Sequence, residues 1–197
     1  MQNIFDPGCS PEEYQKQGKA FPCPDLTKRL CPQCKAALLK KHGFYSRWLC
    51  VIGFSGGILV RRFICKKCKK TVSLLPSFAH PRMSYGIQYV MAALKLFYLN
   101  ELTVTQATQA FQNDTGLNCP RQLLRQFRIR LKENLNRLIT EIIVLLKLQS
   151  PPVTAPANEK RERARQFLEC IQSYDPQDVS LKLFERSGTT FLAPLTN

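Results

Sequence analysis

The chain has 197 residues, of which 44% are hydrophobic, and this composition is typical of a folded globular protein with one medium domain or two small ones. No apolar run approaches the length of a membrane span, so a transmembrane protein is excluded and no membrane partner is expected. The formal net charge is +15, and positions 26–100 contain fourteen Lys and Arg but no Asp or Glu. A field of one sign attracts polyanions, most commonly nucleic acid, although an acidic protein or a membrane surface can be met in the same way.

The first thirty residues contain several Pro and Gly and little hydrophobic periodicity, so residues 1–30 are predicted to form an extended or loosely packed N-terminal arm. They have neither the basic start nor the apolar core of a signal peptide, which favours a cytoplasmic protein with reduced thiols. Cys9 and Cys23 are irregularly spaced and are expected to be packing thiols rather than metal ligands.

Two Cys-x-x-Cys pairs, separated by thirty residues, form the strongest motif in the chain. Each pair can turn both sulfurs toward one ion, and two pairs supply the four thiolates of a closed structural zinc site. Four thiolates leave no open position for water or substrate, so a catalytic metal is not expected. The sequence therefore predicts one structural Zn²⁺, with these ligands: Cys31, Cys34, Cys65 and Cys68.

The spacer between the cysteine pairs is predicted to be a β-hairpin. Residues 44–52 and 58–64 are rich in aromatic and β-branched side chains, and Ser55-Gly56-Gly57 between them is a turn signal. Residues 71–76 can add a third strand, and residues 31–80 are thus predicted to form a zinc ribbon.

The two histidines of the chain, His42 and His80, are expected not to be ligands, because four cysteines already complete the metal site. The Lys and Arg of the ribbon are expected to contact nucleic-acid phosphates. These residues are Lys40, Lys41, Arg47, Arg61, Arg62, Lys66, Lys67, Lys69 and Lys70.

Helices are predicted after the ribbon. Residues 85–99 have apolar side chains at the spacing of an amphipathic helix, and Thr103 with Gln106 has the form of a capping box that begins a short second helix. After a polar break, Pro120 suits the first position of a long third helix over residues 120–149. A short second helix followed by a turn and a third helix is typical of a helix-turn-helix domain, here residues 81–149.

The start of the third helix is basic, and Arg and Gln are residue types that read base edges in the major groove. A solvated basic face is the alternative. The candidate DNA-contacting residues of this helix are Arg121, Gln122, Arg125, Arg128 and Lys132.

An apolar seam with a seven-residue repeat follows on the same helix and predicts a homodimer interface. The alternative is that Phe167, Leu168 and Ile171, beyond the linker, fold back and cover the seam within one chain. The seam residues are Leu131, Leu135, Leu138, Ile142 and Leu145.

Residues 150–158 are rich in Pro and predict a linker, and residues 159–197 predict a C-terminal helix and a tail that could be a strand or a peptide-like extension. The expected fold class is α+β: a small β zinc ribbon followed by a mainly α-helical domain.

The ribbon motif, from Cys-Pro-x-Cys through Arg61-Arg62-Phe63 to Leu74-Leu75-Pro76, resembles small bacterial proteins associated with transposons. It is also similar to the zinc-ribbon and helix-turn-helix head of insertion-sequence transposases. The resemblance implies a metal-stabilised module that recognises double-stranded DNA at an element end or an operator, in the bacterial cytoplasm and close to the nucleoid. Only 65 residues follow Lys132, which is too few for the nuclease domain of those transposases, so no enzymatic activity is expected.

The sequence therefore predicts a zinc-stabilised DNA-binding protein, transposon-associated or regulatory. An interaction subunit whose basic ribbon binds RNA or an acidic protein surface is the alternative.

Overall fold

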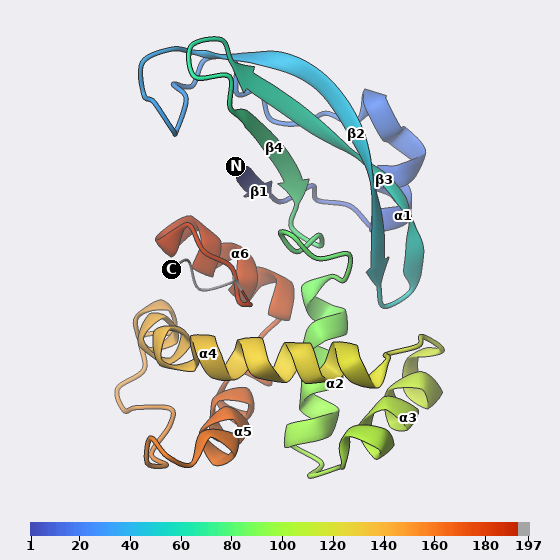
Figure 1. Cartoon of the computed structure of the whole chain (residues 1–197), viewed down its shortest axis with the longest axis vertical. Coiled ribbons are helices and arrows are strands. Elements are labelled where there is room, and N and C mark those ends of the chain that lie inside the picture. The colour runs from blue at the N-terminus through green and yellow to red at the C-terminus, as the bar shows by residue number, and fades with distance from the viewer. Residues whose placement is uncertain (193–197) are drawn as a thin grey trace. The chain divides into compact units, whose positions relative to one another are not determined.

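A four-stranded sheet and six α-helices make up the computed structural model, which describes residues 1–192 and confirms the predicted α+β class. The chain divides into two compact units, each described separately below: Met1–Gly86, here called the ribbon unit, and a helical unit that begins at Ile87 (Figure 1). None of the described helices is both long enough and apolar enough to cross a membrane.

The sheet of the ribbon unit has the order β1-β4-β3-β2. Strands β2 (Leu39–Val51) and β3 (Phe54–Cys65) form the predicted antiparallel hairpin, which is long and curved in Figure 1. Strand β4 (Thr71–Pro76) pairs antiparallel with β3 as the predicted third strand. Strand β1 (Gln2–Phe5) adds to β4 in the parallel direction and completes the sheet.

The hairpin turn lies at residues 52–53 and not at the predicted Ser55-Gly56-Gly57, which lies inside β3. A two-residue hairpin loop needs backbone with positive φ, and Gly53 supplies it at +84°. Gly56 remains a glycine of the strand because a Cβ there would come within 2.9 Å of the Gln15 side chain. Crowding, rather than a turn, explains this glycine.

The prediction of a loose N-terminal arm is wrong, because residues 1–21 are an integral part of the ribbon unit. Helix α1 (Pro11–Gln17) begins with a capping box between Ser10 and Glu13 and is followed by a short 3₁₀ helix, η1 (Gly18–Ala20). Tyr14 is buried, and its hydroxyl donates to the carbonyl oxygen of Leu59 at 3.0 Å. The helix thereby covers the part of β3 that β4 does not pair with.

Both faces of the sheet carry buried apolar side chains. Because successive residues of a strand point to opposite faces, Phe63 and Cys65 of β3 face one way, and Ile58 and Val60 the other. The first pair belongs to a cluster at the cysteine end, which also contains Leu26, Cys31, Leu39, Val72 and Leu74. The second pair belongs to a larger cluster with Tyr14, Phe21, Leu49, Val51, Phe54, Leu75, Phe78 and Ala79.

Gly86, at the end of the ribbon unit, has no space for a side chain. A Cβ built there would lie 2.3 Å from Cγ1 of Val51 and 2.6 Å from the carbonyl oxygen of Phe78. We expect Gly86→Ala to destabilise the ribbon unit by about 1–3 kcal/mol, as overpacking of a filled core does. Denaturant unfolding followed by Trp48 fluorescence measures the change. Gly57→Ala is the control, since its Cβ would meet only Ser46 Oγ at 3.5 Å; equal unfolding midpoints for the two variants would contradict this packing.

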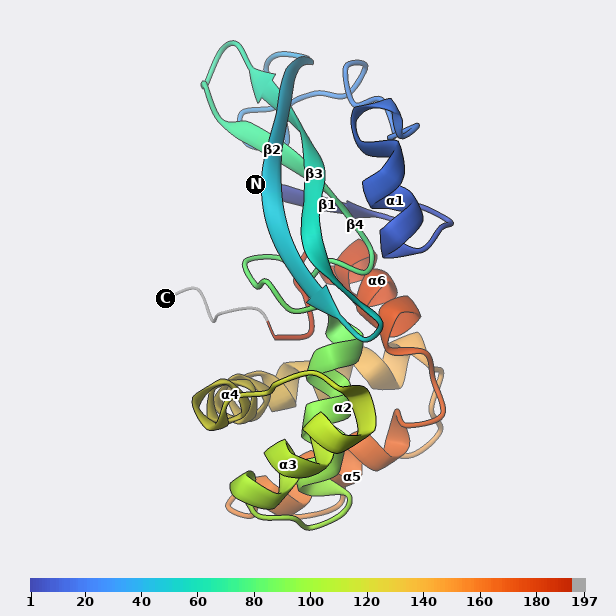
Figure 2. The same ribbon diagram turned by 90° about the vertical axis from the view of Figure 1, so that its right-hand side faces the viewer.

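The helical unit contains α2 (Ile87–Tyr98), α3 (Val104–Thr115), α4 (Arg121–Leu145), α5 (Lys160–Cys170) and α6 (Pro176–Ser187). The predicted capping box is present, because the Thr103 side chain accepts from the amide of Gln106, whose side chain accepts in return from the amide of Thr103. Gly116 ends α3 in the left-handed conformation. Helix α2 contacts α3, α4 and α5, and α4 runs across it (Figures 1 and 2).

The apolar seam of α4 is covered within one chain. Leu131, Leu138 and Ile142 have no exposed surface and Leu135 is only 3% exposed, whereas Leu145 is half-buried. Helices α5 and α6 both pack on α4, and Phe167, Leu168 and Ile171 are buried, as the alternative foresaw. The predicted homodimer through this seam therefore loses its premise, an apolar surface left uncovered by the chain.

The C-terminal residues also differ from the expected strand or peptide-like tail. Asp175 caps α6 by accepting from the amide of Asp178, and Phe191 and Leu192 are buried. The sequence alternates Val179, Leu181 and Leu183, but helix start and stop signals outweigh this short alternation. The rest of the predicted tail, residues 193–197, lies outside the described part of the chain. The predicted linker, residues 150–158, contains neither helix nor strand.

Candidate metal centre and nucleic-acid interface

The hairpin brings the two cysteine pairs together. Cys31 and Cys34 lie in the loop before β2, whereas Cys65 ends β3 and Cys68 follows it in a turn. Leu39 is paired with Cys65 in the hairpin register, so the loops at both ends of the spacer meet at the same end of the sheet.

The four sulfurs have the separations expected around a single ion. All lie within 4.8 Å of one another, and the pairs Cys31–Cys68 and Cys34–Cys65 are each 3.6 Å apart. A tetrahedral ion with metal–sulfur bonds of about 2.3 Å places its sulfurs about 3.8 Å apart. A disulfide would need about 2.05 Å, and all nine cysteines are free thiols. The cluster can therefore hold one metal ion with four sulfur ligands.

The two cysteine loops have the same backbone conformation. In each, the amide four residues after the first cysteine donates to its carbonyl: Lys35 to Cys31 at 2.8 Å and Lys69 to Cys65 at 2.9 Å. Both lysines have positive φ, +52° and +59°, which a residue with a Cβ adopts only when its surroundings demand it. Two independent loops are thus bent to the same shape around one centre.

The thiols of this cluster do not titrate alike. The amide of Cys68 donates to the sulfur of Cys65 and, with the amide of Lys67, lowers the pKa of that thiol to about 6. The amide of Lys70 lowers the pKa of the Cys68 thiol, but burial and the neighbouring thiols outweigh it and raise this pKa to about 11. Four sulfurs this close can all be thiolates only when a cation neutralises them.

The remaining predicted non-ligands lie outside the cluster. Cys9 and Cys23 are half-buried and pack against the apolar cores of the ribbon unit. His42 is exposed and His80 is buried, and neither belongs to the sulfur cluster.

Lysines surround the metal end of the ribbon unit. The sequence placed six candidate lysines there, and all six are exposed. Lys28, Arg29 and Lys35 of the first cysteine loop are also exposed and were not among the candidates; their position beside a metal loop was the signal that could have identified them. The six candidates are Lys40, Lys41, Lys66, Lys67, Lys69 and Lys70.

The arginines of the ribbon are less accessible than predicted. Arg47 is half-buried, and its guanidinium donates to the carbonyls of His80 and Met83, so it is occupied in holding this segment to β2. Arg61 lies over the Phe44 ring at 4.4 Å, and Arg62 over the Tyr45 ring at 5.5 Å. Because its guanidinium is committed within the protein, Arg47 is not a free phosphate contact.

The basic residues of α4 fall into two groups. Arg121, Gln122 and Arg125, at the start of the helix, are exposed. Arg128 and Lys132 are half-buried, and Arg128 lies 3.8 Å from the centre of the Phe97 ring of α2. The prediction of one exposed basic stripe is therefore corrected: its second half faces neighbouring helices.

Several large apolar side chains of the ribbon unit are exposed, which the sequence did not indicate. Leu30 and Leu38 are 58% and 52% exposed and lie opposite each other in an isolated β-bridge beside the first cysteine loop. Trp48, in the middle of β2, is 61% exposed. An exposed aromatic ring near cations is a common element of nucleic-acid surfaces.

Residues 31–111 match a family model described as "Domain of unknown function (DUF6431)". The matched segment begins at the first cysteine of the cluster and extends through the hairpin and β4 into α3. Comparison with curated proteins and with solved structures gives no match.

Proposed function

We propose that this chain is a zinc-stabilised protein that binds double-stranded DNA. The observation that carries the proposal is the basic surface at the metal end: residues 26–100 contain no acidic side chain, and the lysines around both cysteine loops are exposed. A surface kept soluble only by charge would mix both signs, whereas a one-signed surface favours a polyanion.

Zinc is the proposed ion because four thiolates at tetrahedral separations are its usual structural ligand set. The ion would be held by the four cysteines and would supply rigidity and charge neutralisation, with no position open for chemistry. Its role is to fix the two basic loops side by side, so that their lysines form one surface.

Affinity and sequence preference are assigned to different parts of the chain. The exposed ribbon lysines would contact phosphates, which gives affinity that falls steeply with salt. Arg121, Gln122 and Arg125, exposed at the start of α4 after the α3–α4 turn, would read bases in the manner of a helix-turn-helix. Arg47, Arg128 and Lys132 are left out of this assignment because they are committed within the protein.

A transposon-associated or regulatory role without nuclease activity, in the bacterial cytoplasm at the nucleoid, remains our hypothesis for the setting of this DNA binding. Its support is the resemblance of the ribbon motif to transposase heads. The proposal contains no catalytic step, and four carboxylates of the helical unit are engaged in ion pairs: Glu141, Glu162, Glu169 and Asp178.

Unpaired nucleic acid, RNA included, is a second candidate ligand, and Trp48 is the observation that favours it. An exposed indole can stack on an unpaired base, which contributes about 1–3 kcal/mol per base. The nearby Phe44 is covered by Arg61, so Trp48 is the free ring of this strand face.

The test begins with selection of a target from random duplexes. We expect the double variant Lys40→Gln/Lys67→Gln to weaken binding to matched and scrambled duplexes equally and to flatten the salt dependence by about two counterions. Arg125→Gln should weaken the matched duplex by about 1–3 kcal/mol more than the scrambled one. Lys182→Gln, which removes an exposed charge of α6, is the control for net charge.

Fluorescence anisotropy with labelled duplex, competed by unrelated duplex, single strands and RNA, measures these effects. Preferential competition by RNA or single strands, abolished in Trp48→Ala, would favour the second candidate. Equal loss on both duplexes for Arg125→Gln would contradict the assignment of base reading to α4.

A further inference from the structure

Three helices of the helical unit bring positive side chains together around one aromatic ring. Arg128 of α4 lies with its Cζ 3.8 Å from the centre of the Phe97 ring of α2, and Arg161 of α5 with its Cζ 5.1 Å from the same centre. Lys132 of α4 lies near both arginines and near Lys160, since their charges act on its ammonium. These four cations are here called the basic cluster: Arg128, Lys132, Lys160 and Arg161.

The basic cluster is under mutual repulsion. Partial burial of Lys132 lowers its pKa, and the charges of Arg128, Lys160 and Arg161 lower it further. Like charges held close together in a partly buried place destabilise the fold unless an anion joins them. The packing of α2, α4 and α5 thus leaves a place where negative charge is favoured.

Two buried polar atoms beside the cluster lack a well-formed hydrogen bond within the described part of the chain. They are the hydroxyl of Tyr98, a residue only 1% exposed, and Nε of Arg128. Burial raises the pKa of Tyr98 although the charges of Arg128 and Arg161 lower it, so the hydroxyl remains a donor at neutral pH. Buried donors without acceptors are rare in folded proteins, and a bound ion is one recognised reason for them.

The start of α5 adds to the same preference for an anion. Lys160 and Arg161 are its first two residues, and its N-cap residue makes no side-chain hydrogen bond to the helix. The positive end of a helix dipole disfavours cations and attracts anions, so two cations here oppose the usual pattern. An anion at this position would accept from the helix start and from the cluster together.

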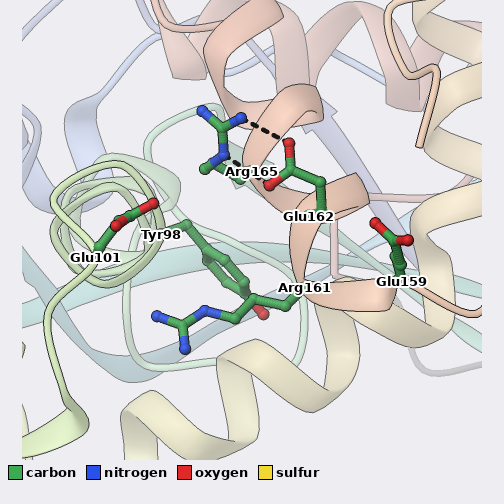
Figure 3. A pocket seen from close by; sticks show the side chains of 6 residues that line it. All are labelled: Tyr98, Glu101, Glu159, Arg161, Glu162 and Arg165. Atoms are coloured by element: carbon green, nitrogen blue, oxygen red, sulfur yellow. Dashed lines mark hydrogen bonds and ion pairs between the residues drawn. The ribbon is translucent and has the colours of Figure 1, made fainter.

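A cavity of about 300 Å³ opens at this point, lined by Tyr98 and Arg161 together with Glu101, Glu159, Glu162 and Arg165. Its acidic side chains are largely compensated: Arg165 is ion-paired with Glu162 at 2.6 Å and with Glu169, and Glu101 acts on the same arginine. Figure 3 shows the Arg165–Glu162 contacts, whereas the guanidinium of Arg161 has no such partner among the residues drawn. Of the lining carboxylates, Glu159 alone is left against the four cations.

We propose that Tyr98, Arg128, Lys132 and Arg161 form a binding site for a phosphate group. A phosphate offers several acceptor oxygens and up to two negative charges, which match three cations and a hydroxyl donor. This site goes beyond DNA binding by the ribbon and does not depend on it. The phosphate can belong to a free ion or nucleotide, or to the backbone of a nucleic acid that reaches α4.

The test is calorimetric titration of the full-length chain with inorganic phosphate, with ionic strength held constant by chloride. We expect saturable binding that Arg161→Gln weakens by about tenfold or more, the factor carried by a lost charge-assisted hydrogen bond. Lys182→Gln removes one charge elsewhere in the same unit and should leave the titration unchanged. Tyr98→Phe should weaken phosphate binding while leaving the phosphate-free protein equally stable or more stable, because it removes a buried hydroxyl without an acceptor.

Two results would overturn the site: no heat beyond the chloride control, or equal affinity in the unmodified chain and in Arg161→Gln. The source of the phosphate is decided by a DNA arm. If Arg161→Gln also weakens duplex binding, the site takes a backbone phosphate; if duplex binding is unchanged, it takes a free phosphate or nucleotide. Failure of all DNA binding with intact phosphate binding would refute the proposed function and leave this site standing.

Discussion

Cys65→Ser is expected to abolish stoichiometric metal binding and to unfold the ribbon unit, while the helical unit keeps its helices. Cys65 is fully buried, its thiol has the lowered pKa of the cluster, and it lies 3.6 Å from Cys34 across the centre. Binding of a structural zinc contributes on the order of 10 kcal/mol to folding, more than the typical stability of a small domain. Without the ion, the two cysteine loops have no reason to retain lysines at positive φ.

Metal analysis of the purified protein and near-ultraviolet circular dichroism together measure this effect. Cys9→Ser is the matched control, because Cys9 lies in the same unit, is half-buried and is not a ligand. Retention of one metal per chain in Cys65→Ser, or full metal binding with an unchanged spectrum after replacement of both Cys65 and Cys68, would refute the four-cysteine centre.

Leu138→Glu is the second change with a large expected effect, and it should unfold the helical unit. The Leu138 side chain has no exposed surface, and α4 packs on both α5 and α6. Placing a carboxylate there removes apolar burial and adds an unpaired charge, so a loss above about 4 kcal/mol is expected. A dimer seam would respond differently: the variant would stay folded and dissociate.

Helical circular dichroism and analytical sedimentation separate these outcomes. Val144→Glu, on the same helix but 48% exposed, is the control and should leave the unfolding midpoint within about 0.5 kcal/mol of the unmodified protein. A Leu138→Glu protein that is fully helical and half the mass of the unmodified form would restore the dimer interpretation.

The metal centre could be predicted from sequence because a Cys-x-x-Cys pair contains most of its geometry within four residues. The helices after position 86 were recognised for a similar reason, since the capping box at Thr103 and the spacing of apolar residues are local signals. The hairpin turn was misplaced because glycine has two uses, and only the fold shows that Gly56 is crowded whereas Gly53 turns the chain.

Features that depend on distant partners could not be predicted in this way. Strand β1 has four residues and pairs with a segment about seventy positions away, so no local pattern marks it. A heptad seam shows that α4 must be covered but not by which helix. Charge likewise does not distinguish Arg125, which faces solvent, from Arg128 three positions later, which stacks on Phe97.

The parallel pairing of β1 with β4 has a consequence for the order in which the chain can fold during synthesis. Gln2 to Phe5 leave the ribosome first, yet their partners Ser73 to Pro76 are made about seventy residues later. The hairpin between them closes with local contacts and contains both halves of the metal centre, so it can form first. The first strand must then wait, unpaired, and join as the last edge of a sheet that the metal has already begun to hold.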